Sequence, residues 1–300
     1  MKVAVFYYSQ SGQALCVAKS ICKPLVEYGH QVIYKPICPS EEFPYPWNKN
    51  EFFDIFPETR LGLPPFGINA IDLSDIEDAG LVIIAGQSWF LSPSIPIQSF
   101  FNDGVVRSYL HDRDVVFVNA CRNMWLMTAR QIKSYTKDIG ARLVGHIVLQ
   151  DHHANLISAL TIVRWLMFNR KESKFLLPDA GVSKKDIDSA DRFGNVIADA
   201  YSNDKVDSLQ DELLKKGAII YKPSVLFLEK AGHRMFGLWA RYIRKKGGFR
   251  DKRRRTRVNM FFYYLLFVLF VVSPFAQLFF FMTYPLQKVN SQYKLDCYLK

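Results

Sequence analysis

The sequence has few cysteines, and those it has do not suggest a disulfide framework. There are five (Cys16, Cys22, Cys38, Cys121 and Cys297), an odd number with no CxxC pair. Disulfide-rich domains and cysteine-based zinc sites both depend on closely spaced cysteines in sets. We therefore expect reduced thiols, a cytoplasmic setting for the folded part and no metal site.

The sequence also lacks an apolar leader, because the first expected strand begins almost at Met1. No signal or transit peptide is therefore expected before the fold. Hydrophobic residues make up 49% of the 300 residues, which excludes a largely disordered chain. A chain of this length suits one large domain with additions, or two small domains.

The net positive charge is small over most of the chain and is concentrated in one block. The formal net charge is +11, and residues Arg244–Arg257 carry nine Lys or Arg against one Asp. The rest of the chain is therefore close to neutral. A block of this kind indicates an anionic partner, either a membrane surface or a nucleic acid.

The segment Val258–Met282 contains no charged residue and directly follows the basic block. It is long enough to cross the ~30 Å hydrocarbon core of a bilayer, and Pro274 in its middle can be accommodated as a kink. We expect a single transmembrane helix with the basic block on the cytoplasmic side, in contact with membrane lipid. A hairpin folded at Pro274 is the alternative. Nucleic-acid binding is not expected.

The first strand and the turn that follows it have the pattern of an anion site. The apolar residues Val3, Val5 and Phe6 lead into Ser9-Gln10-Ser11-Gly12-Gln13, and an amphipathic helix is expected over residues 14–28. Backbone N–H groups at a helix N-terminus and adjacent hydroxyls suit a phosphate, and a glycine lets the backbone approach it closely.

Strands and helices alternate along the next part of the chain, which favours an α/β fold with a parallel sheet. Between them, residues 39–65 form a long aromatic and proline-rich connection, interpreted either as a surface loop or as a wall of an apolar pocket. The apolar segment Asn155–Phe168 is expected to be a buried helix or one that dips toward a membrane. Further strands are expected at 31–37, 81–85, 115–120 and 142–149. A short helix is expected to begin at Pro96, and further helices are expected at 127–140, 183–201, 207–216 and 226–243.

Three loops follow the first, third and fourth of these strands. In a doubly wound sheet, ligands bind beyond the carboxyl ends of the strands. The second and third loops carry Trp89, Phe90 and Trp125, whose rings can stack on a flat heterocycle. A flat ring with one phosphate, held by neutral donors, is flavin mononucleotide (FMN).

On the motifs YYSQSGQ, GQSWFLSPS and NACRNMW, residues 1–200 resemble the flavodoxin-like family. The resemblance implies a doubly wound parallel five-stranded sheet in the order 2-1-3-4-5, here with a C-terminal helical extension and a transmembrane helix. Ala14 stands where the family often has a hydroxyl, which implies weaker FMN binding. The implied phosphate contacts are Ser9, Gln10, Ser11, Gly12 and Gln13, and the implied ring contacts are Gln87, Ser88, Trp89, Phe90, Cys121, Arg122 and Asn123.

The whole chain, through FPYPW, FFDIFPE, WFLSPSIP, CRNMWLM and NLISALTIVRW, resembles the flavodoxin-like proteins encoded with dialkylresorcinol and flexirubin-type pigment genes. These are often labelled dialkylresorcinol condensing enzymes. The resemblance implies FMN-dependent aromatisation of a 2,5-dialkylcyclohexane-1,3-dione to a dialkylresorcinol, downstream of a ketosynthase. Nothing in the motifs resembles a thiolase-type condensing site.

The chemistry needs a base, for which His152 and His153 at the end of the fifth strand are the first candidates. Cys121 is a second candidate acid or base, and Arg122 is placed to stabilise enolate charge. The pair of histidines is equally compatible with a simple strand end facing water, and Cys121 with a small core residue.

Three other functions remain open from the sequence: a membrane-tethered flavodoxin that carries electrons, an NAD(P)H-dependent quinone or FMN reductase, and a lipid-binding scaffold without flavin. A homodimer is compatible with the sequence. The expected segments are an FMN domain at 1–205, an amphipathic and basic juxtamembrane region at 206–257, the transmembrane helix at 258–284 and a short tail at 285–300 across the membrane.

Overall fold

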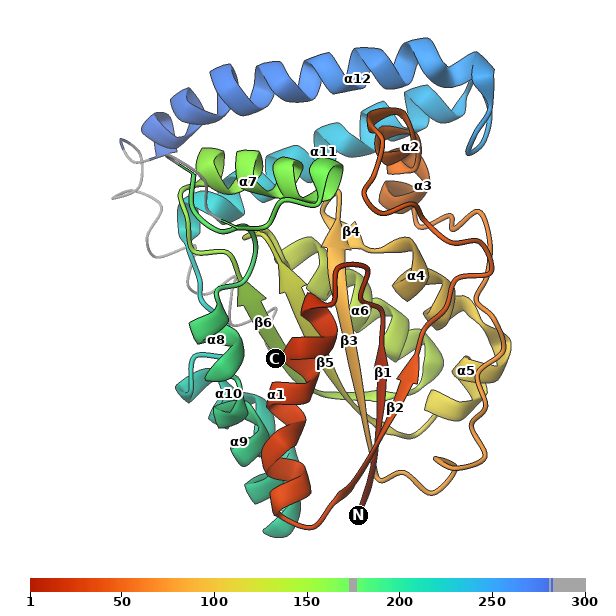
Figure 1. Ribbon diagram of the computed structural model, residues 1–300, viewed down its shortest axis with the longest axis vertical. Helices are drawn as coiled ribbons and strands as arrows, with labels where there is room; N and C mark the ends of the chain where they lie inside the picture. Colours follow the sequence, from red (N-terminus) through yellow and green to blue (C-terminus); the bar gives the residue numbers. More distant parts are fainter. Residues whose placement is uncertain (173–176, 281, 283–300) are drawn as a thin grey trace.

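The computed structural model describes residues 1–172, 177–280 and 282, and its centre is a parallel sheet (Figure 1). Its strands lie in the order β2-β1-β3-β5-β6, and β4 (Ser92–Pro93) pairs antiparallel with the end of β3. Without this short hairpin strand, the order is the 2-1-3-4-5 expected from the sequence, so that prediction is confirmed. The parallel strands are β1 (Lys2–Tyr7), β2 (Gln31–Pro36), β3 (Leu81–Trp89), β5 (Asp114–Cys121) and β6 (Arg142–Gln150).

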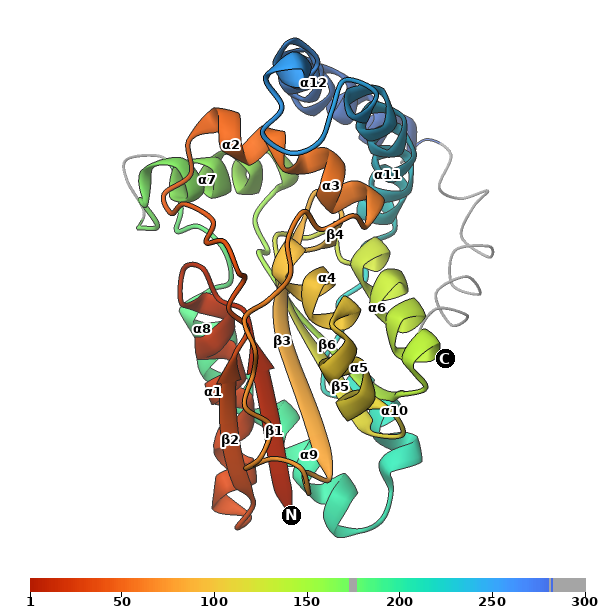
Figure 2. The same cartoon turned by 90° about the vertical axis from the view of Figure 1, so that its right-hand side faces the viewer.

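Helices cover both faces of the sheet (Figure 2). Alternate residues of β1 point to opposite faces, so Val3 and Val5 enter one core and Ala4 and Phe6 the other. The first core holds α1 (Gln13–Glu27), α9 (Asp191–Ser202) and α10 (Leu209–Lys215), with α8 (Lys184–Asp188) beside α1; the second holds α4 (Ile95–Asn102), α5 (Gly104–Leu110) and part of α6 (Leu126–Ile139).

The helices that cover the sheet differ from the sequence expectation in two places. The helix expected at 183–201 is divided at Ser189 and Ala190 into α8 and α9, and α5 was not expected. Leu209 and Leu213 of α10 are fully buried in the first core, next to a single 3₁₀ turn, η1 (Val206–Ser208). The globular core therefore continues beyond residue 205, where the sequence analysis set a boundary.

The aromatic connection at 39–65 is more ordered than an irregular loop. It contains α2 (Lys49–Asp54) and α3 (Phe56–Leu61). The Asn48 side chain accepts a hydrogen bond from the Glu51 N–H and so caps α2, and Pro57 lies in the first turn of α3. The cap and the proline explain why two short helices form where the sequence predicted an irregular connection. The rings of Phe43, Trp47, Phe53 and Phe56 are buried.

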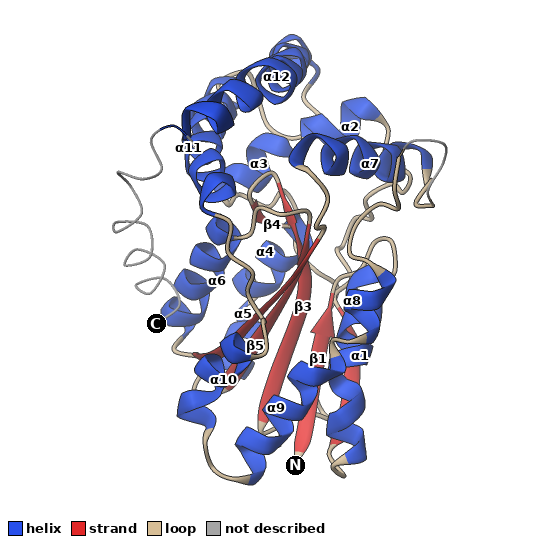
Figure 3. Cartoon of the chain, turned by 90° about the vertical axis from the view of Figure 1, so that its left-hand side faces the viewer, coloured by secondary structure: helices blue, strands red, loops and turns tan. Residues whose placement is uncertain are grey.

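A layer of three helices lies across the end of the sheet at which the parallel strands finish (Figures 1 and 3). It consists of α7 (Asn155–Phe168), α11 (Pro223–Arg244) and α12 (Arg255–Phe267), which begins after the 3₁₀ turn η2 (Lys252–Arg254) and continues through the π-helical turn η3 (Val268–Val272) to Phe280. We call these helices, with α12 taken to Phe280, the roof.

Helices α11 and α12 run antiparallel along their whole length. The rings of Trp239 and Tyr264 lie 5.1 Å apart near the connecting turn, and those of Phe227 and Phe280 lie 5.7 Å apart at the far end. The helix Lys252–Phe280 is 29 residues long and contains an 18-residue window with a mean hydropathy of 2.0, so its length and composition would allow it to cross a membrane. The expected tail at 285–300 lies outside the described residues.

Part of the basic block is engaged in a buried ion cluster. Arg254 is fully buried, with Nη1 2.7 Å from Oε1 of Glu58 and Nε 2.7 Å from Oδ1 of Asp54. Arg244 at the end of α11 also reaches Glu58, at 2.8 Å. These arginines therefore tie the roof to α2 and α3, and they are not available to lipid as the sequence analysis assumed for the whole block.

This cluster makes a prediction about stability. Arg254→Ala leaves Glu58, which is 1% exposed, with Arg244 as its remaining ion partner, so we expect a loss of about 3 kcal/mol in the free energy of unfolding. Arg255→Ala removes the same charge from the exposed neighbouring position and serves as the control. Urea unfolding in mild detergent measures both, and equal midpoints for the two variants would contradict the assignment.

Candidate functional site

The loops selected from the sequence lie side by side at one edge of the sheet. β1, β3, β5 and β6 are successive neighbours, so the loops that follow them form a row beneath the roof. From β1 to β6 the row covers three strand spacings, about 14 Å. One elongated ligand can therefore contact the first and the last of these loops.

The first loop has backbone N–H groups that are available to bind an anion. Ser9 Oγ accepts from the Leu15 N–H at 3.2 Å, and Gly12 has a φ of 82°, which favours glycine. Within the described residues, the N–H groups of Gly12, Gln13 and Ala14 have no hydrogen-bond acceptor. Such free N–H groups at the start of a 15-residue helix suit a phosphate.

The two glutamines of this loop are engaged elsewhere. Gln10 accepts from the indole N–H of Trp47 at 2.8 Å and donates to the Pro44 carbonyl. Gln13 exchanges hydrogen bonds with the backbone N–H and C=O of Val182. Their side chains therefore hold neighbouring loops, and the contacts left for a phosphate are the backbone N–H groups and the hydroxyl of Ser11, with Ser9 beside them.

The loop after β3 is held by a buried polar network. Ser88 Oγ lies 2.7 Å from Thr128 Oγ1 and accepts from Asn119 Nδ2 at 3.1 Å. The Gln87 carbonyl accepts from the Ser94 N–H, which closes the short hairpin. Phe90 and Leu91 adopt positive φ angles at its tip. The network fixes the position of the loop relative to α6.

The two rings of this hairpin pack against other aromatic residues. Trp89 lies edge-on to Trp47, with centroids 5.5 Å apart, and is 9% exposed. Phe90 lies 4.9 Å from Phe52, on the side of α2 and α3. Both rings therefore join the aromatic connection to the sheet edge, and this packing was not anticipated when they were selected for stacking on a cofactor.

The loop after β5 is tied to the start of α7. Arg122 Nη1 donates to the Asn155 carbonyl at 3.0 Å, and Asn123 Nδ2 donates to Asn155 Oδ1 at 3.3 Å. The other amide oxygen, Asn123 Oδ1, is buried without a hydrogen-bond partner. An orphaned acceptor of this kind is costly unless a ligand or water donates to it, so it marks this loop as a contact point.

Cys121 does not have the properties of a catalytic acid or base. The thiol is buried among Trp125, Leu126 and Leu226, and this burial raises its pKa far above the ordinary value. A thiol that stays protonated in an apolar cluster is chemically inert. The interpretation of Cys121 as a small core residue is therefore the one supported by its environment.

The two histidines after β6 have different surroundings. His153 Nδ1 lies 2.6 Å from Oδ1 of Asp151, which is 1% exposed and also accepts from Ser158 Oγ at 2.7 Å. Because a carboxylate can only accept, this bond places a proton on Nδ1 and leaves Nε2 free to act as a base. His152 lies 3.6 Å from Asp186 on α8 and is exposed. The pairing therefore favours His153.

Glu229, which was not expected from the sequence, lies on α11 and enters the site from the roof. Its Oε1 accepts from the Met127 N–H at 2.8 Å, at the start of α6, while Oε2 is buried without a partner. Burial raises its pKa to about 7, partly offset by bonds from the N–H groups of α6. The available signal was its position on the buried stripe of α11, with Leu226, Gly237 and Ala240.

Asp151, Asn155 and Ser158 were also missed as site residues. Asp151 and Ser158 orient His153, and Asn155 joins the loop after β5 to the roof through a 3.4 Å contact of its Nδ2 with Ser273 Oγ. Among residues 1–172, 177–280 and 282, no group of three or more His, Cys, Asp or Glu side chains could hold a metal ion. The site offers hydrogen-bond donors for a phosphate in the first loop, the oriented imidazole of His153 and the guanidinium of Arg122.

No model of a known protein family matches the sequence, and no curated protein matches it. A flavodoxin from the domain Archaea matches 67% of this chain and 99% of its own, with 12% identity and a TM-score of 0.39. A flavoprotein from Lactobacillus acidophilus in complex with FMN matches 49% and 92%, with 18% identity and a TM-score of 0.39. Two-electron reduced Megasphaera elsdenii flavodoxin matches 51% and 89%, with 15% identity and a TM-score of 0.35. At these values the likeness carries no inference about function, so function must be argued from this chain's own residues.

The raised pKa of Glu229 predicts how stability depends on pH. Between about pH 4.5 and 7 the folded state keeps a proton that the unfolded state has lost, so the free energy of unfolding falls as the pH rises and levels off above about 7. This group contributes a fall of about 3 kcal/mol. Comparing wild type with Glu229→Gln by urea unfolding at pH 5 and pH 8 isolates the effect.

The Gln variant keeps the acceptor for Met127 but does not titrate, so we expect it to gain stability relative to wild type as the pH rises. Glu212→Gln, at an exposed position on α10, is the control and should follow wild type at both pH values. A difference between wild type and Glu229→Gln that is the same at pH 5 and pH 8 would contradict the prediction.

Proposed function

We propose that this chain is an FMN-dependent oxidoreductase that aromatises a 2,5-dialkylcyclohexane-1,3-dione to a dialkylresorcinol at the cytoplasmic face of a membrane. The observation that carries the proposal is that an open helix N-terminus and a carboxylate-oriented imidazole lie at the same edge of a doubly wound sheet. The first suits the phosphate of a mononucleotide and the second suits proton abstraction.

FMN fits the groups that this edge leaves unsatisfied. The N–H groups of Gly12, Gln13 and Ala14 and the Ser11 hydroxyl would hold the phosphate. The orphaned Asn123 Oδ1 would accept from a ring N–H, beside Gln87 and Ser88. When bound, FMN supplies a two-electron acceptor for hydride. Because Ala14 offers no hydroxyl to the phosphate, we expect FMN to bind reversibly.

His153 removes the proton in this scheme. The ring C–H beside a 1,3-dione is acidic, and His153 Nε2 takes the proton while Asp151 holds the imidazole and stabilises its positive charge. Loss of that proton and of one hydride removes two hydrogens from the ring, and enolisation then gives the resorcinol. Arg122, whose guanidinium stays charged, stabilises the enolate oxygen.

The apolar surroundings suit a substrate with two alkyl chains. The roof lies across the carboxyl ends of the strands, and it packs on the aromatic connection in an apolar cluster. A substrate of this type partitions into lipid, so delivery from a membrane surface is part of the proposal. A ketosynthase that joins two acyl chains would supply the dione.

The test is anaerobic mixing of FMN-loaded protein with a 2,5-dialkylcyclohexane-1,3-dione. We expect the flavin absorbance band to bleach while the resorcinol forms. His153→Gln should slow the bleaching by about 10²–10³-fold without changing FMN affinity, while His152→Gln stays within a few-fold of wild type.

Bleaching by NADH or NADPH alone would point instead to a reductase, and a stabilised one-electron state in a redox titration to an electron carrier. Equal effects of the two histidine substitutions would contradict the role of His153.

The phosphate assignment gives a separate prediction. Ser11→Glu places a negative charge at the turn, so the affinity for FMN should fall about tenfold or more, while the affinity for riboflavin, which lacks the phosphate, should change little. Ser202→Glu on α9 adds the same charge at an exposed position and should affect neither ligand. Flavin fluorescence titration measures all four affinities, and equal losses for FMN and riboflavin in Ser11→Glu would contradict the assignment.

A further inference from the structure

We propose that the roof is a membrane-binding face on which α12 lies in the plane of an anionic bilayer, alongside α11, and does not cross it. The proposal is independent of the chemistry described above. It rests on which side chains of the three roof helices are exposed, and on the charges that α11 carries along the contact with α12.

The clearest sign is that α7 exposes large apolar side chains although two of its four buried residues are polar. Its buried side includes Ser158 and Thr161, both fully buried, and Ser158 faces the Asp151 carboxylate. Its exposed side carries large apolar residues at helical spacing: Ile157, Leu160, Val163 and Phe168. A helix that faces water has the opposite arrangement. The outer side of α7 therefore matches an apolar environment.

The roof as a whole repeats this pattern. Eighteen of the twenty-five exposed large hydrophobic residues in the described part of the chain belong to α7, α11 and α12 as far as Phe280. Phe275, Leu278 and Phe279 are each more than half exposed. Exposed apolar area concentrated on one end of a molecule marks an interaction surface.

The pairing of α11 with α12 argues against a simple span. Ring contacts hold the two helices together near both ends, from Trp239 and Tyr264 to Phe227 and Phe280. α11 carries the basic residues Lys230, Arg234 and Arg241 and the buried Glu229. Charges in the hydrocarbon core are strongly unfavourable. If α12 crossed the bilayer with α11 still packed against it, the charges of α11 would enter the hydrocarbon core. The two helices therefore keep their ring contacts only if both lie along the membrane–water interface.

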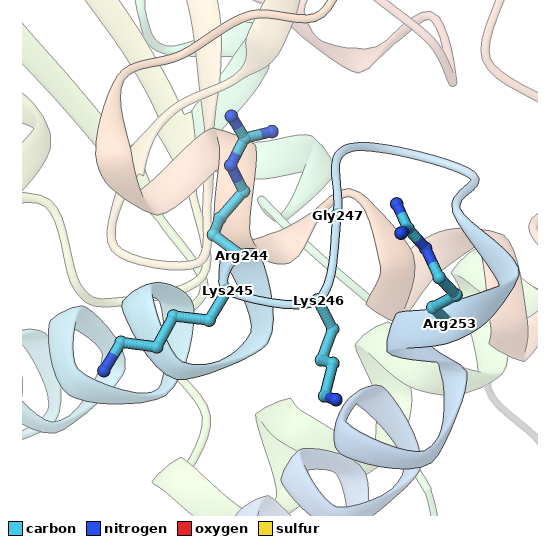
Figure 4. A pocket seen from close by; sticks show the side chains of 5 residues that line it. All are labelled: Arg244, Lys245, Lys246, Gly247 and Arg253. Carbon is cyan, nitrogen blue, oxygen red and sulfur yellow. The ribbon is translucent and has the colours of Figure 1, made fainter.

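The charges at one end of the roof fit anionic headgroups. A cavity of about 720 Å³ at the turn between α11 and α12 is lined by Arg244, Lys245, Lys246, Gly247 and Arg253. Figure 4 shows Lys245 and Lys246 pointing away from the two arginines, which are paired with Glu58 and Asp251. Both lysines are exposed. They complement lipid phosphates at the edge of the apolar face.

The binding test uses the full chain and vesicles of phosphatidylcholine alone or with a quarter of phosphatidylglycerol. We expect flotation with the anionic vesicles and a loss of about 25-fold in affinity for Lys245→Ser/Lys246→Ser, about fivefold per lysine. Lys133→Ser/Lys137→Ser on α6 removes the same charge away from the roof and should bind as wild type. A dimer that buries the roof and does not float would overturn the proposal.

Topology is tested with a membrane-impermeant maleimide. In Cys16→Ser/Cys38→Ser protein, Cys297 is the only thiol of the chain apart from the buried Cys22 and Cys121. An in-plane α12 predicts labelling in inverted vesicles of a bacterial host and none in intact spheroplasts. Labelling in spheroplasts would overturn the in-plane arrangement in favour of a span. Cys16→Ser/Cys297→Ser protein keeps Cys38 as the cytoplasmic control.

Discussion

The arrangement of this molecule depends on one buried guanidinium. Arg254 donates to Glu58 and Asp54 of the aromatic connection and to the Gly247 carbonyl, and Arg244 adds a second cation beside Glu58. Each charge is compensated, so the cluster is tolerated away from water. Because Arg254 precedes α12 and Arg244 ends α11, the cluster fixes the turn between them, and with it the position of the roof above the strand ends.

The roof in turn completes the site at the sheet edge. Glu229 caps the start of α6 from α11, and Asn155 connects Arg122 and Asn123 to Ser273 of the apolar helix. If the apolar helix left the domain to span a membrane, the contact between Asn155 and Ser273 would be lost. The proposed cofactor loops and the roof are therefore parts of one structure, which suits the proposed chemistry on a lipid-soluble ring.

The sequence predicted what depends on local pattern. Apolar runs ended by small polar turns identified the strands and the three loops, because hydrophobic periodicity and glycine turns are short-range signals. The strand order came from the resemblance to the flavodoxin-like family and not from these local signals. It did not predict which polar side chains are already engaged. Gln10 and Gln13 were expected to contact a phosphate, yet their side chains bond Trp47 and Val182. Those contacts join residues far apart in the chain, and no local pattern encodes them. Glu229 was missed for the same reason.

Hydrogen exchange with and without FMN is the most direct test of whether the loops at 9–15 and 121–127 bind one cofactor. If they do, FMN slows exchange at Gly12–Leu15 and at Asn123–Met127 together, at the same half-saturating concentration, while the outer strand β2 is unchanged. Slowing in one segment alone, or in neither at saturating FMN, would contradict the binding of one cofactor by both loops.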